Sequence, residues 1–159
     1  RWRPRPPARA GGSRPPARLG VVPGSGPSNV NGVRRSDQRR DAVFALYQRD
    51  VTGRPLEELL RDARPFTREL AEETAAEIEE LDAEIARLSK GWSLDRIATL
   101  ERSIMRVALH EMRDPEGPPV EVAIDEAVNL AKEFCGADAP AFVNGILGSA
   151  AREMEKAAR

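Results

Sequence analysis

The chain has 159 residues and a formal net charge of −1 at pH 7, with 40% hydrophobic, 32% charged and only 4% aromatic residues. This composition is typical of a soluble globular protein with one sizeable core, and its scarcity of aromatic residues favours helices over a pleated sheet. Cys135 is the single cysteine and His110 the single histidine, which excludes an internal disulfide framework and a Cys/His zinc site.

Residues 1–33 are rich in Pro, Gly, Arg and Ser and lack apolar periodicity, so we expect them to be disordered. The chain begins with Arg1 and not with Met, which is compatible with a trimmed fragment or with translation from too far upstream. Residues 1–40 hold ten Arg and one acidic residue, whereas residues 41–159 hold fifteen basic and twenty-five acidic ones. Because Arg clusters release counterions when they meet phosphates, the basic end indicates a polyanionic partner.

The rest of the chain is predicted to be all-α, because apolar residues recur there every three or four positions. The pattern predicts helices over about 36–51, from Pro55 to just before Pro65, over 66–88 without interruption, over 94–112 as one helix or a short one joined to a long one, over 120–134, and from Pro140 onward. Ser93 and Asp138 stand where a helix cap is expected. Six or seven short amphipathic helices indicate a helical bundle.

Two glycines, Gly145 and Gly148, lie inside the last predicted helix at a cost of about 1 kcal/mol each relative to Ala. Glycine at such positions implies that another backbone approaches closely. The approaching group is either a neighbouring helix or a nucleic-acid strand, and packing within the protein is the default. The acidic outer face of the 66–88 helix is interpreted as a solvated side and not as a docking surface.

No catalytic, cofactor or membrane signal is recognisable. His110-Glu111 lacks the second histidine of the two-histidine zinc helix motif. Cys135 follows Phe134 in an apolar stripe, which indicates a buried structural thiol and not a nucleophile. No apolar run approaches the roughly 20 residues of a membrane span, and no secretory signal begins the chain. We therefore expect a cytoplasmic protein with no enzyme activity, no cofactor and no metal.

Residues suited to nucleic-acid binding are concentrated at the start of the first predicted helix. Arg34, Arg35, Arg39 and Arg40 gather there, and Phe44 and Tyr47 follow at helical spacing. Arginine offers a planar fork to phosphate, and an aromatic ring offers a face to an unpaired base. The alternative is a solubilising helix start with Tyr47 in the core. Arginine at a helix N-terminus opposes the macrodipole, a conflict that an external anion would remove.

Four blocks of sequence resemble one family, that of the bacterial transcription antitermination factor NusB. The blocks are ALY at 45–47 after the Arg-rich start, LERSIMRVALHE at 100–111, VAIDEAVNLAK at 122–132 and FVNGIL at 142–147. The resemblance runs from about Arg34 to Glu155, and we place a NusB-like RNA-binding domain at residues 34–156. It implies two three-helix bundles packed roughly perpendicular, with an additional helix depending on where boundaries are drawn.

The resemblance also implies a function and partners. Proteins of this family pair with the ribosomal protein NusE and bind the single-stranded boxA element of nascent ribosomal RNA. As part of the RNA polymerase antitermination complex, they promote read-through of terminators. The expected protein is therefore a non-catalytic adaptor, and a homodimer is a further option.

Site residues are carried over by position from the matching blocks. The RNA-binding candidates are Arg35, Arg39, Tyr47, Lys132, Phe142 and Asn144, and Arg40 is added from charge alone. We expect Arg39 to be exposed, so that Arg39→Ala would weaken RNA binding and leave stability nearly unchanged. Glu101 and Arg106 are the candidates for the NusE-facing surface, with ordinary surface charges as their alternative. Ser36 and Asp37 depart from the family pattern, where basic residues are common, which would weaken RNA affinity.

Three alternatives stay open from the sequence. The chain could be a structural helical dimerisation module whose glycine-containing last helix packs against a second copy. It could also be a stand-alone relative of the RNA-recognition domain of ribosomal RNA cytosine methyltransferases. A helical enzyme would have to rely on carboxylates alone.

Overall fold

The structure, a computed structural model, describes residues 34–90 and 92–159. The expected disorder of residues 1–33 lies outside this range. The described residues form helices and no strand, and the elements are α1 (Arg35–Thr52), α2 (Leu56–Leu59), α3 (Pro65–Ala76), α4 (Ile78–Leu88), the 3-10 helix η1 (Leu94–Arg96), α5 (Thr99–Arg113), α6 (Val120–Phe134) and α7 (Ala139–Ala157). Among the described helices, none has the length and apolarity needed to cross a membrane.

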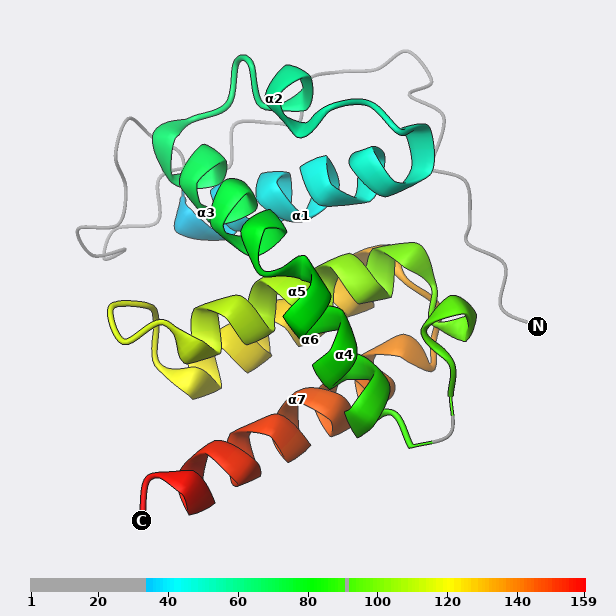
Figure 1. Cartoon of the computed structure of the whole chain (residues 1–159), viewed down its shortest axis with the longest axis vertical. Helices are drawn as coiled ribbons and strands as arrows, with labels where there is room; N and C mark the ends of the chain where they lie inside the picture. Colours follow the sequence, from blue (N-terminus) through cyan, green and yellow to red (C-terminus); the bar gives the residue numbers. More distant parts are fainter. Residues whose placement is uncertain (1–33, 91) are drawn as a thin grey trace.

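The helices form two bundles that share α5 (Figure 1). In the first bundle, α1 packs against α2 and α3, and in the second, α4, α6 and α7 pack with α5. Helix α5 also contacts α1 and α3, so it lies between the bundles, and all its residues from Ser103 to Met112 are buried. The predicted all-α fold with two helical bundles is therefore confirmed.

The predicted 66–88 helix is wrong as a single element, because the chain divides it into α3 and α4 at Glu77. The backbone of Glu77 turns away from helical geometry, with φ −106° and ψ 13°. Just before this point, the Thr74 hydroxyl donates a 2.7 Å hydrogen bond to the carbonyl of Leu70, a contact that tends to bend helices. The bend lets α3 pack on α1 while α4 packs on α7.

The second predicted helix is shorter than expected. Only Leu56–Leu59 is helical, although Leu60 is buried as the apolar stripe requires. The Arg68 guanidinium donates to the carbonyls of Leu60 and Arg61, which takes the place of further helical hydrogen bonds. Ser93 and Asp138 occupy the N-cap positions of η1 and α7 as expected, but neither makes a side-chain cap hydrogen bond.

The glycines of α7 do not serve packing between described helices. A Cβ atom added at Gly145 would meet nothing within 4 Å, and one at Gly148 would meet only the side chain of Arg152, at 3.4 Å. The default expectation of a closely approaching helix is therefore wrong for the described residues. Gly145 instead lies exposed on α7.

Candidate nucleic-acid interface

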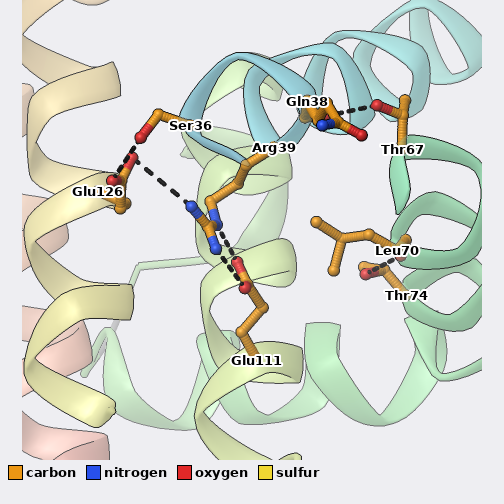
Figure 2. Close-up of polar contacts among 8 residues, drawn as sticks. All are labelled: Ser36, Gln38, Arg39, Thr67, Leu70, Thr74, Glu111 and Glu126. Atoms are coloured by element: carbon orange, nitrogen blue, oxygen red, sulfur yellow. Dashed lines mark hydrogen bonds and ion pairs between the residues drawn. The ribbon is translucent and has the colours of Figure 1, made fainter. Parts of the chain in front are cut away.

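Arg39 is buried and forms an ion pair inside the protein (Figure 2). Its Nε and Nη2 atoms donate to the two carboxylate oxygens of Glu111 on α5, at 2.5 and 2.9 Å, and Glu126 on α6 lies 3.8 Å away. Arg39 is 7% exposed and Glu111 4%. Burial lowers the pKa of Arg39, but the hydrogen bond and the charge of Glu111 outweigh it, so its pKa is raised. The expectation of an exposed Arg39 is wrong.

Further hydrogen bonds fix the start of α1. The Ser36 hydroxyl donates to Glu126 on α6 at 2.7 Å, and the Thr67 hydroxyl donates to the Gln38 carbonyl at 2.9 Å, as Figure 2 shows. Ser36 thus joins α1 to α6. These contacts hold the arginine-bearing end of α1 against three other helices.

Arg35 lies one turn before Arg39 and is exposed. Its guanidinium carbon lies 4.0 Å from the centroid of the Phe66 ring on α3, within the range of a cation–π contact. This contact uses a face of the guanidinium and leaves its N–H edges able to donate. Arg35 is therefore available to a phosphate.

Three aromatic side chains follow one another across α1 and α6, and we call Tyr47, Phe44 and Phe134 the aromatic row. Phe44 and Phe134 meet edge to face with 4.9 Å between ring centroids, and Phe44 and Tyr47 do so at 6.5 Å. Phe134 is 38% exposed, and Tyr47 and Phe44 are half-buried. The row therefore offers ring surface to solvent.

The remaining candidates, on α1, α6 and α7, are accessible to different degrees. Arg40 on α1 is half-exposed and lies 3.6 Å from Asp37 and 3.8 Å from Asp41, which partly offset its charge. Lys132 on α6 and Asn144 on α7 are exposed, whereas Phe142 is half-buried against the core. On α1, Arg40 and Tyr47 are thus partly accessible, whereas Arg39 is buried.

The two partner-binding candidates on α5 differ. Glu101 is half-buried, and burial raises the pKa of its carboxyl. Arg106 is only 4% exposed, and it donates through Nε and Nη2 to Asp82 at 2.6 and 2.7 Å and through Nη1 to Asp50 at 2.5 Å. The expectation of Arg106 on the exposed surface is wrong, because two internal carboxylates occupy its donors.

Cys135 has the properties of a structural thiol. It is partly buried, and burial together with the nearby charge of Glu101 raises the pKa of its thiol to about 12. Nucleophilic cysteines have lowered pKa values, because the thiolate is the reactive form. Cys135 is therefore a poor nucleophile at neutral pH.

Sequence reasoning missed one candidate, Phe134. It lies on the apolar stripe of α6, four residues after the buried Leu130, and was interpreted as core. The stripe continues to the last residue of the helix, but the core ends before it. The only other sequence feature of Phe134 is its position at the end of the helix. That position is too weak a signal to distinguish a half-exposed ring from a buried one.

A family model described as the NusB family matches residues 36–152. The chain belongs to the NusB family. The transcription antitermination protein NusB of Rubrobacter xylanophilus is 44% identical over 123 residues, which cover 73% of this chain and 88% of that protein. NusB of Bacillus subtilis is 35% identical over 130 residues, covering 78% and 99%. The family assignment confirms the prediction that this chain is not an enzyme.

Solved NusB structures share the fold. The NusB structure from T. maritima is 28% identical with a TM-score of 0.70, covering 76% of this chain and 92% of that one. A chain in a crystal structure of the antitermination factors NusB and NusE in complex with double-stranded RNA is 26% identical with a TM-score of 0.65, covering 72% and 93%.

Proposed function

We propose that this chain acts in transcription antitermination by binding boxA-type single-stranded RNA of nascent ribosomal transcripts together with NusE, so that RNA polymerase reads through terminators. The names of its relatives and the NusB and NusE complex with RNA support this role. Transcription in bacteria would place the protein in the cytoplasm. The observation that carries the RNA-binding part is the exposed aromatic row, which has cationic residues on the same two helices.

The aromatic row matches the way proteins hold unpaired nucleotides. Splayed bases stack on aromatic faces, and such stacking contributes about 1–3 kcal/mol per base. Tyr47 and Phe134, at the two ends of the row, are the stacking residues in this proposal. Arg35, Arg40 and Lys132 would neutralise phosphates, and Asn144 would donate to a base edge or a sugar hydroxyl.

Two of the candidates take indirect roles in this proposal. Arg39 positions the first turn of α1 through its pair with Glu111, and so holds Arg35 and Arg40 in place. Phe142 is half-buried and anchors the start of α7, where Asn144 is exposed. Both would affect RNA binding through the shape of the surface.

Glu101 is the candidate for contact with NusE. Its carboxylate loses hydration through burial, which raises its pKa. A cationic side chain of NusE would restore part of the lost solvation. Glu101→Gln should then weaken NusE binding while RNA binding by the isolated chain stays unchanged.

The RNA proposal is tested by titrating a boxA oligonucleotide at several salt concentrations, with and without NusE. For single strands the slope of log K against log salt is about −0.7 per phosphate neutralised, so Arg40→Gln should reduce its magnitude by about 0.7. Arg54→Gln is the matched control, because Arg54 is an exposed arginine just beyond the other end of α1, where it pairs with Glu58 on α2. Equal effects of the two changes would contradict the proposed surface.

Stacking is tested by replacing rings with leucine. Tyr47→Leu and Phe134→Leu should each weaken binding by about 1–3 kcal/mol at every salt concentration, because stacking does not release counterions. Trp92→Leu serves as control, since Trp92 is an exposed aromatic residue outside the row. A duplex of the same sequence should bind more weakly than the single strand. Unchanged binding by both row variants would overturn the proposal.

A further inference from the structure

A groove of about 880 Å³ lies between α3 and the C-terminal end of α5, and Arg35 is the one residue of its lining that the proposed function assigns to phosphate contact. Acidic side chains outnumber basic ones along it. Its lining includes the carboxylates of Glu69, Glu73, Glu77, Glu111, Asp114 and Glu116, against the cations of Arg35, Arg39 and Arg113. Arg39 and Glu111 already neutralise each other. The remaining surplus of negative charge would attract cations.

The only histidine of the chain is buried at this groove, with carboxylates at both ring nitrogens. His110 is 7% exposed, its Nδ1 lies 2.9 Å from Glu77 and its Nε2 lies 3.1 Å from Glu73. Glu73 and Glu77 are one turn apart in sequence, on either side of the end of α3. A carboxylate on one ring nitrogen is the usual way in which proteins orient a histidine whose other nitrogen binds a metal.

Asp114 completes the group from the other side. It follows α5 directly, one turn after His110, and the Glu116 N–H donates to one of its carboxylate oxygens at 2.9 Å. A ligand atom from each of Glu73, His110 and Asp114 lies within 4.8 Å of the others. Metal bonds of about 2.0–2.2 Å place neighbouring ligand atoms a little over 3 Å apart. Glu73 and His110 Nε2 already have this spacing, at 3.1 Å, so the group needs only a small movement to hold an ion.

We propose that this group binds one divalent transition-metal ion, with His110 Nε2, Glu73 and Asp114 as ligands and Glu77 holding the imidazole through Nδ1. Two carboxylates and one neutral imidazole balance the 2+ charge. Imidazole favours zinc, cobalt or nickel over magnesium and calcium, which prefer all-oxygen sites. The ion takes the place of any proton on Nε2, which leaves to solvent. Because the ligands come from α3, from α5 and from the residue after α5, the ion joins these two helices.

The proposal is tested by titrating Zn²⁺ into the metal-free full chain by calorimetry, with Co²⁺ absorption as a second probe. The wild-type chain should bind one ion per chain saturably, and Zn²⁺ should raise its Tm. Asp114→Asn and His110→Phe should remove saturable binding, and Glu77→Gln should weaken it by about 10- to 100-fold. Glu69→Gln is the matched control, because Glu69 is an acidic residue of the same groove outside the ligand group.

Several results would overturn the site. Absence of saturable Zn²⁺ binding to the wild-type chain would do so, as would Mg²⁺ binding that matches Zn²⁺. Equal weakening by Glu69→Gln and Asp114→Asn would show diffuse attraction to an acidic groove. If His110→Phe does not fold, Asp114→Asn and Glu73→Gln decide, and retained binding in both refutes the ligand set. None of these readouts involves RNA, so the result is independent of the proposed function.

Discussion

Replacing Arg39 by alanine should lower the free energy of unfolding. This change is the most direct test of the buried ion pair. The change leaves Glu111, 4% exposed, without its bidentate partner. Removing one partner of a buried pair costs about 3–5 kcal/mol, because the other charge stays buried and uncompensated. Typical domains are stable by only about 5–15 kcal/mol, so this loss is a large share.

The assay is thermal and urea unfolding followed by circular dichroism. For a folded unit of this size, the expected loss corresponds to a Tm lower by about 10 to 20 °C. Arg35→Ala is the matched control, since Arg35 is an exposed arginine one turn earlier on the same helix. The double change Arg39→Met with Glu111→Met should recover most of the stability, because it removes both charges. An Arg39→Ala loss no larger than that of Arg35→Ala would refute the reasoning.

Four further predictions concern stability and reactivity. Gly117→Ala should cost about 1–3 kcal/mol in urea unfolding, because a Cβ there would lie 2.7 Å from the carbonyl oxygen of Glu111; an unchanged midpoint would contradict the tight turn. Gly145→Ala should instead stabilise α7 by about 0.5–1 kcal/mol, since its Cβ meets nothing, and a loss of stability would show a missed contact. Ile104→Ala should cost about 2–5 kcal/mol through a core cavity, and an unaffected Tm would place Ile104 outside the core. The pKa of the Cys135 thiol is raised to about 12, so at pH 8 the native chain has a smaller thiolate fraction than the unfolded chain. Iodoacetamide should therefore alkylate Cys135 about a thousandfold more slowly in the native than in the unfolded chain. Similar rates would contradict the burial of this thiol.

Helices whose stripe ends at a glycine or a proline could be predicted closely from the sequence. The 120–134 helix has the bounds that its periodicity and flanking residues indicate. The break at Glu77 could not be predicted, because the residues around it are good helix formers at unbroken spacing. Tertiary packing contributes to the break, since α3 packs on α1 whereas α4 packs on α7.

The candidate site was predictable in residue type but not in exposure. The arginines and Tyr47 were found from their position at the start of α1, yet periodicity could not tell which arginine meets a carboxylate. Arg39 pairs with Glu111, which is 72 positions away, and Arg106 pairs with Asp50, which is 56 away. Pairs of this kind depend on how helices pack, and one sequence holds no direct record of them.

The position of α5 between the bundles constrains how the chain folds as it is synthesised. Helices α1 to α3 leave the ribosome first, but their apolar faces need α5, which begins at Thr99. The apolar faces of α1 to α3 therefore stay partly exposed until more than half of the protein has been translated. Helices α1 to α3 can pack on α5 once it emerges, and α6 and α7 pack on it after they follow. Neither bundle should therefore persist as an independent folding unit.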